Sequence, residues 1–80
     1  MDTYTDSVIT WRLQEFMEQH AVTQYALQKK SGVALNTIKG IYNRKTKRPD
    51  LEVLDRIISA LGELVKHEVS VSDVLEYKRG

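Results

Sequence analysis

Apolar side chains recur every three or four residues near the start of the chain, a spacing that aligns them along one side of a helix. Asp6 and Ser7 both have the short polar side chain of a helix N-cap. The apolar stripe that follows consists of Ile9, Leu13, Phe16 and Met17. The pattern predicts an amphipathic core helix that starts after Asp6 or Ser7 and runs to about Gln19, with Trp11 off the stripe in ordinary packing.

Residues 23–44 have the pattern of two short helices separated by a glycine turn. Thr23 can cap the first helix through its hydroxyl oxygen. Gly32 can end that helix, because glycine takes a positive φ without steric penalty, and Val33 is expected to be buried. The second helix starts at Leu35, and its apolar side consists of Ile38, Ile41 and Tyr42. The polar residues Asn36, Thr37, Lys39 and Asn43 fall elsewhere around the helix, so one side is expected to pack and the other to face solvent.

A further helix is predicted to start at Asp50, after Pro49, and to stop near Gly62. Its apolar stripe consists of Leu51, Leu54, Ile57, Ile58 and Leu61. The tail from residue 63 leaves several alternatives open. In one alternative the helix continues to His67. In the other, Val69 and Val71 lie on one side of a short extended piece because they alternate with polar residues.

Ser70 or Ser72 can then cap a last short helix that carries Val74, Leu75 and Tyr77. The aliphatic groups of the tail either close the core or form a dimer surface. Residues 1–6 and 78–80 are expected to be mobile.

Eighty residues correspond to one domain, 1–80, in which a single core is just sufficient. The fold class expected is all-α, a bundle of four to five helices. The chain has no cysteine, its two histidines lack a metal-binding spacing, and no nucleophile and base stand in a recognisable arrangement. We therefore expect no metal, no cofactor and no enzyme activity. The longest apolar runs are too short to span a membrane, and a cytoplasmic location is expected.

The net charge of +1 conceals an uneven distribution of charge. Between Gln19 and Pro49 there is no Asp or Glu, but there are seven cations: Lys29, Lys30, Lys39, Arg44, Lys45, Lys47 and Arg48. The rest of the chain carries five basic and eleven acidic residues, a net of −6. This split concentrates positive charge where a polyanion can bind, although a solvated charged surface gives the same pattern.

Residues 12–61 resemble the Cro/repressor-type (XRE-like) helix-turn-helix family. The residues that carry the resemblance are Gln24, Leu27, Gly32, Val33, Ile38, Ile41 and the sequence Pro49-Asp50-Leu51. The resemblance implies a phage-repressor-like domain that binds double-stranded DNA through the motif at about 23–44. Residues 35–43 would then form the recognition helix in the major groove.

The resemblance also implies roles for single residues. The base-reading candidates are Leu35, Asn36, Thr37 and Lys39, whose amide, ammonium and methyl groups match the edges of bases. The phosphate-contacting candidates are Gln24, Asn43, Arg44, Lys45, Lys47 and Arg48. Arg12 either reaches a phosphate or pairs with Glu15 or Glu18.

The chain departs from the family pattern at identifiable positions. Gln28 stands where the family prefers alanine, so the helices cross at a wider separation or the glutamine turns outward. Ala34 replaces the usual Ser or Thr cap, which forgoes about 1 kcal/mol. Gly40 lies inside the recognition helix and is either tolerated there or required by a close approach. Arg44 stands where glycine is common, in a loop that reads as one residue longer.

The expected function is that of a small transcriptional regulator of bacterial or phage type, a repressor associated with the nucleoid. Specificity would ordinarily require a homodimer on two half-sites. A second hypothesis is a DNA-binding antitoxin or interaction module that acts with a partner protein such as a toxin or co-regulator. A third is a structural bundle with a solvated basic surface and no role in nucleic-acid binding.

Overall fold

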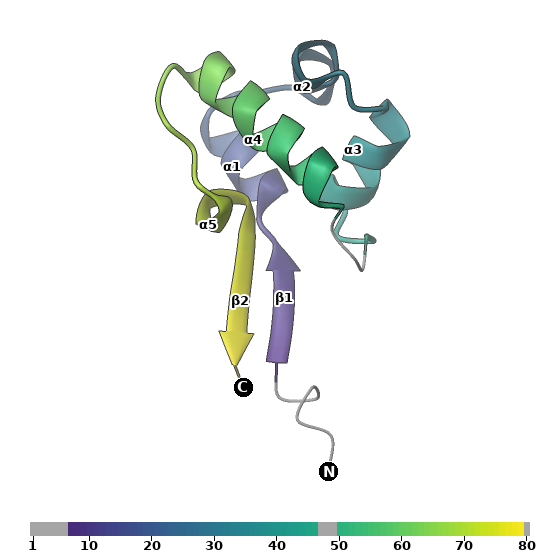
Figure 1. The fold of residues 1–80 in the computed structure, drawn as a ribbon, viewed down its shortest axis with the longest axis vertical. Helices are drawn as coiled ribbons and strands as arrows, with labels where there is room; N and C mark the ends of the chain where they lie inside the picture. Colours follow the sequence, from purple (N-terminus) through teal and green to yellow (C-terminus); the bar gives the residue numbers. More distant parts are fainter. Residues whose placement is uncertain (1–6, 47–49, 80) are drawn as a thin grey trace.

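The computed structural model describes residues 7–46 and 50–79, which form a helix-rich small domain with a two-stranded sheet (Figure 1). The elements in chain order are β1 Ser7–Trp11, α1 Leu13–Gln19, α2 Gln24–Ser31, α3 Leu35–Tyr42, α4 Leu51–Val65, α5 Val71–Val74 and β2 Leu75–Arg79. The helices gather around one core, and the two strands leave it side by side in one direction (Figure 1).

Strands β1 and β2 form an antiparallel sheet, here called the terminal ribbon (Ser7–Trp11 and Leu75–Arg79). The prediction of an all-α bundle of four to five helices is confirmed in part, because five helices make up most of the described chain and the ribbon is the exception. The predicted start of the first helix was wrong, because α1 begins at Leu13. The physical reason is the run Ser7–Trp11, which is rich in the β-branched and aromatic residues that favour strands and has a partner strand at the other end of the chain. Ile9 is 55% exposed and does not belong to the core.

The tail also differs in part from the expectation. Helix α4 continues through Gly62 to Val65, so Gly62 is not its stop, and Lys66 ends it in the left-handed conformation with φ 67°. Ser70 caps α5 in a reciprocal pair of bonds with Asp73, as one of the alternatives had it.

Helix α5 stops at Val74, so Leu75 and Tyr77 lie in β2. Residues 78 and 79 are paired with β1 in the terminal ribbon, and their expected mobility stays a prediction. The expected mobility of residues 1–6 and of Gly80 lies outside the described residues.

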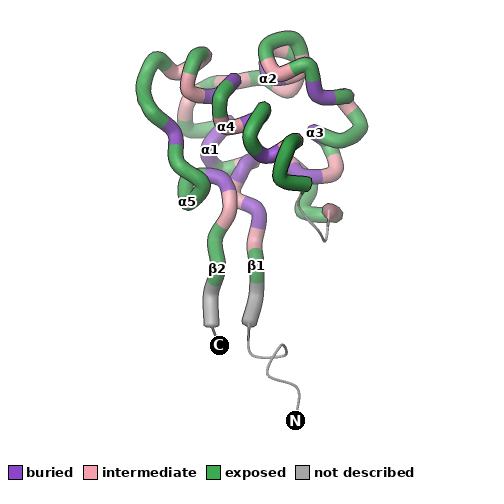
Figure 2. Tube along the Cα trace, viewed as in Figure 1, coloured by how far each residue is buried: buried purple, intermediate pink, exposed green. Residues whose placement is uncertain are grey.

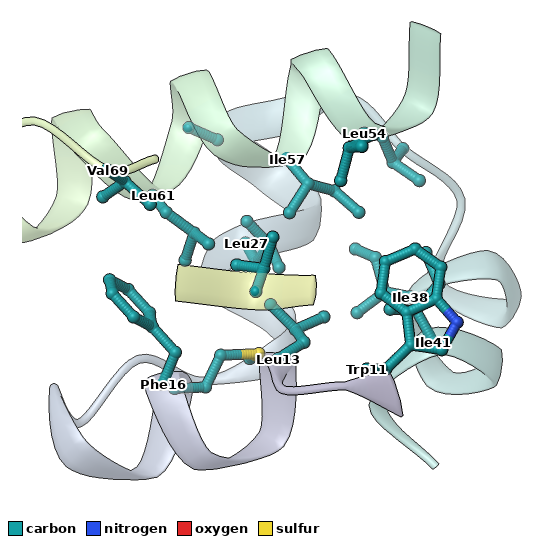
Figure 3. Close-up of a cluster of buried hydrophobic side chains, with 14 residues drawn as sticks. Trp11, Leu13, Phe16, Leu27, Ile38, Ile41, Leu54, Ile57, Leu61 and Val69 are labelled. Atoms are coloured by element: carbon teal, nitrogen blue, oxygen red, sulfur yellow. The ribbon is translucent and has the colours of Figure 1, made fainter. Parts of the chain in front are cut away.

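The core lies between α1 and α4, with contributions from α2 and α3 (Figure 3). Buried positions follow the inner sides of the helices, whereas their outer sides are exposed (Figure 2). In the terminal ribbon, Ile9, Glu76 and Tyr77 are exposed. The buried apolar residues are Trp11, Leu13, Phe16, Met17, Leu27, Val33, Ile38, Ile41, Leu54, Ile57, Ala60, Leu61, Val69 and Val74. Val69 and Val74 thus close the core from the tail, whereas Leu51, expected on the stripe of α4, is 77% exposed.

Candidate nucleic-acid interface

Helix α2 and the turn after it have the geometry that their sequence predicted. The Thr23 hydroxyl oxygen accepts a hydrogen bond from the Ala26 N–H at 3.0 Å, which confirms the N-cap. Gly32 has φ 74° and ends the helix, with its N–H bonded to the Gln28 carbonyl. The hydroxyl oxygen of Ser31 accepts a bond from the Val33 N–H at 3.1 Å, a turn contact that the sequence did not suggest. The turn between α2 and α3 is therefore set by local backbone chemistry.

Helix α3 buries one side and leaves the other open. Ile38 and Ile41 are buried, as predicted, and they belong to the same cluster as Trp11 (Figure 3). Three base-reading candidates are exposed, namely Asn36, Thr37 and Lys39, whereas Leu35 is partly buried. Ala34 precedes the helix without a side-chain cap, so its first backbone N–H groups have no partner from the capping residue.

The phosphate-contacting candidates lie at two places. Gln24 is partly buried at the first position of α2, and Asn43, Arg44 and Lys45 follow α3 directly and are exposed. Asn36, Lys39 and Asn43 are spaced by three and four residues, so they lie along one side of α3 and its C-cap. Lys47 and Arg48, together with any extra length of the loop, lie outside the described residues.

The chain folds back on α3 as soon as the helix ends. The Arg44 N–H donates to the Ile41 carbonyl, and the N–H groups of Lys45 and Thr46 donate to the Gly40 carbonyl at 2.8 and 3.2 Å. Arg44 has φ 60°, so the turn is a Schellman motif with arginine at the position that glycine usually takes. A left-handed conformation costs a non-glycine residue about 1–2 kcal/mol.

Gly40 is explained by this turn. A Cβ atom at Gly40 would lie 3.0 Å from Oγ1 of Thr46, which is tighter than ordinary van der Waals contact. Of the two alternatives for this glycine, the structure supports close approach: the chain after α3 passes directly against the helix backbone.

The Arg44 side chain returns to the first part of the chain. Its Nε donates to the Trp11 carbonyl at 3.0 Å, and its Nη2 donates to Oε2 of Glu15 at 2.6 Å. The Trp11 indole N–H donates to the Thr46 carbonyl at 2.8 Å. Trp11 is therefore more than ordinary packing, because it forms hydrogen bonds with residues that follow α3. Sequence reasoning missed this use of Trp11 and Glu15, and its one visible signal was an arginine in place of glycine at position 44.

Glu15 is shared between two arginines. It accepts from Arg12 at 3.0 Å as well as from Arg44, and Arg12 also pairs with Glu76 in β2 at 3.1 Å. Arg12 thus pairs with Glu15, one of its two expected uses. The pKa of Glu15 lies below its ordinary value, first because a backbone N–H bonds its carboxylate and then because Arg44 and Arg12 favour its charged form.

Other cations of the acid-free window differ in their surroundings. Lys30 pairs with Glu63 at 3.1 Å, and the Lys29 ammonium lies 5.4 Å from the centre of the Tyr25 ring. Lys39 and Lys45 form no ion pair with any residue that the structure describes. Their charges on α3 and in the turn after it are therefore available to a ligand.

The C-terminal end of α3 is also tied to α1. The Tyr42 hydroxyl donates to Oε2 of Glu18 at 3.2 Å. The pKa of Tyr42 is raised by desolvation and by the negative charge of Glu18. This bond holds the last turn of α3 against α1, whereas the exposed Asn36 and Thr37 lie in the first turn of α3.

Within residues 7–46 and 50–79, no group of three or more His, Cys, Asp or Glu side chains is placed to hold a metal ion. None of the described helices combines the length and apolar character needed to cross a membrane.

Comparison with known proteins identifies the family. A search of curated proteins and a search of solved structures gave no match. The family model described as Cro/C1-type HTH DNA-binding domain matches residues 12–79, which include α1 to α5, and domains of this kind are typically not enzymes. The match extends from the arginine that follows β1 to the last described residue of β2. The chain belongs to the Cro/C1-type helix-turn-helix DNA-binding domain family.

Proposed function

We propose that this protein binds double-stranded DNA sequence-specifically and acts as a small transcriptional regulator, as a repressor. The observation that carries the proposal is the two-sided character of α3. Ile38 and Ile41 anchor the helix in the core, while Asn36, Thr37 and Lys39 are exposed, and the width of the major groove admits an α-helix. The family match to a DNA-binding domain supports the same assignment.

In this proposal the start of α3 reads base edges. Asn36 is suited to a bidentate contact with adenine, and Lys39 can donate to O6 or N7 of guanine. Thr37 and Leu35 would contact thymine methyl groups, with Leu35 contributing less because it is partly buried.

Contacts to phosphates would fix the orientation of α3 without reading sequence. The residues proposed for them are Gln24, Asn43, Arg44, Lys45, Lys47 and Arg48. Lys45 has the clearest support among them, because it is exposed and forms no ion pair with a described residue. Arg44 uses two of its five N–H groups on Trp11 and Glu15, so three remain for a phosphate.

One recognition helix covers few base pairs, so we propose that the protein acts as a homodimer on two half-sites about 34–36 Å apart. The test is selection of binding sequences from a random duplex library at stated salt, together with sedimentation of the protein. A palindromic consensus with that half-site spacing supports both the DNA-binding role and the dimer.

Enrichment of no sequence, together with co-purification of a second chain, would favour the antitoxin or interaction module instead. A lack of salt dependence in binding to duplex DNA would contradict the proposed phosphate contacts altogether.

A further inference from the structure

Trp11 and Arg44 join the terminal ribbon to the turn that follows α3 by two hydrogen bonds in opposite directions. The Trp11 side chain donates to the backbone of Thr46, and the Arg44 side chain donates to the backbone of Trp11. Each bond uses a side chain to fix a backbone carbonyl, so together they hold two segments, 33 to 35 residues apart in sequence, at one separation. We call Trp11, Glu15, Arg44 and Thr46 the junction.

Glu15 completes the junction from helix α1. Its carboxylate binds the Arg44 guanidinium at 2.6 Å, which orients the side chain that reaches the Trp11 carbonyl. Arg44 itself is held in a left-handed conformation, which its backbone does not favour. The side-chain contacts with Trp11 and Glu15 offset that cost, so the conformation of the turn depends on them.

The junction holds the segment that carries Lys45, an exposed cation that forms no ion pair with a described residue. Lys45 lies between Arg44 and Thr46, which both belong to the junction, and its own N–H donates to the Gly40 carbonyl. The position of the Lys45 main chain relative to α3 is therefore fixed from both sides.

We propose that Glu15 and Trp11 are positioning residues for DNA binding, which hold the turn after the recognition helix where Lys45 meets a phosphate. The inference rests on the proposed function, because it assigns the support behind its phosphate contacts. It has an unusual consequence for Glu15. Neutralising an acid near a DNA-binding surface ordinarily strengthens binding, whereas loss of the Glu15 contact with Arg44 works against binding.

A double-mutant cycle tests the proposal. Binding of the selected duplex is measured for the wild type, Glu15→Gln, Arg44→Met and the double variant, at a temperature well below their unfolding midpoints. Methionine keeps an unbranched apolar stem like that of arginine and has no donor group. Glu15→Gln is expected to weaken binding more in the wild-type background than in the Arg44→Met background. The difference between the two effects should be about two- to fivefold, which corresponds to the free energy of an exposed ion pair.

The matched control is Glu68→Gln, which removes an exposed acid from the segment between α4 and α5, outside the junction. Its effect on binding is expected to be the same in both backgrounds. Equal effects of Glu15→Gln in the two backgrounds would overturn the proposal, because they would show that Glu15 acts only through its charge.

The salt dependence of binding provides a readout that a purely stabilising role would not change. Glu15→Gln removes no cation, yet the slope of log K against log salt is expected to become shallower by up to about one contact, because Lys45 leaves its phosphate. Trp11→Phe keeps an aromatic ring in the core, removes the bond to Thr46, and is expected to show the same loss.

Unchanged slopes in both variants would overturn the proposal. Failure of the wild type to bind any duplex in a salt-dependent way is a different result, because it would refute the proposed function itself.

Discussion

A Cβ atom placed on Gly40 would lie 3.0 Å from Oγ1 of Thr46, although the two residues belong to a helix and to the turn that leaves it. The main chain of Thr46 has little freedom to move away from Gly40. Its N–H is bonded to the Gly40 carbonyl, and its own carbonyl accepts from the Trp11 indole. The glycine inside α3 is therefore matched to the path of the chain behind it.

Gly40→Ala is expected to give no gain in stability, although alanine is favoured over glycine in a helix by about 0.5–1 kcal/mol. The contact with Thr46 cancels the gain. In a Thr46→Ala background the contact is removed, and the same substitution is expected to stabilise the protein by roughly that amount. Thermal unfolding followed by circular dichroism measures both changes.

Gly62→Ala provides the control. Gly62 also lies within a helix, but a Cβ there would meet only the His67 carbonyl oxygen at 3.4 Å, an ordinary contact. Gly62→Ala is therefore expected to stabilise the protein on its own, with no second substitution. A gain from Gly40→Ala alone equal to that from Gly62→Ala would show that Thr46 moves aside freely.

Ala34→Ser is expected to raise the free energy of unfolding by about 0.5–1 kcal/mol. Ala34 precedes α3 with φ −58° and ψ 142° and makes no side-chain cap, whereas Thr23 caps α2 through its hydroxyl. A serine hydroxyl at position 34 can accept from the exposed N–H groups of the first turn. Chemical denaturation measures the gain, and an unchanged midpoint would mean that the hydroxyl does not reach them.

Lys45→Ala and Asn36→Ala are expected to affect DNA binding in different ways. Loss of Lys45 should weaken binding to all duplexes alike and reduce the salt slope by about one. Loss of Asn36 should cost about 1–3 kcal/mol on the preferred site and little on other sequences, with the salt slope unchanged. Titrations of a selected and an unrelated duplex at several salt concentrations separate the two. Exchange of the two patterns would reverse the assigned roles.

Glu15→Gln is expected to destabilise the protein in a pH-dependent way. Because the pKa of Glu15 in the folded protein lies below its ordinary value of 4.5, its charged form contributes stability above that value. This contribution is lost as the pH falls through the folded-state pKa. The difference in melting temperature between wild type and variant should therefore be largest near pH 7 and vanish in strong acid. The corresponding loss in the free energy of unfolding should stay below about 1 kcal/mol, since Glu15 and Arg44 are both about half exposed. A difference that persists in strong acid would contradict the charge-based explanation.

The motif helices could be predicted because their determinants are local. The Thr23 cap, the left-handed Gly32 and the spacing of Ile38 and Ile41 all act within a few residues, and the structure confirms each of them. The terminal ribbon could not be predicted in the same way. Ser7 pairs with Arg79, so the run at the start of the chain becomes a strand only because a distant segment is present.

The features of the candidate site also differ in whether nearby or distant residues determine them. The exposure of Asn36, Thr37 and Lys39 followed from the period of α3, because helical spacing alone sets which side is open. The partners of Arg44 lie 33 and 29 residues away in sequence, and no local pattern identifies them. An arginine in a position that suits glycine indicated a departure from the family pattern without indicating what stabilises it.

The pairing of Ser7 with Arg79 also has a consequence for the order in which the molecule assembles. Joining segments at opposite ends of the chain closes a long loop, and the entropy of that closure is lost in a single step unless the helices in between have already drawn the ends together. Contacts that are local in sequence, such as those within α2 and α3, form sooner. The two strands should therefore pair last in folding, after the helical core has formed. The hydrogen bonds between Trp11 and the turn after α3 would then be among the last to form.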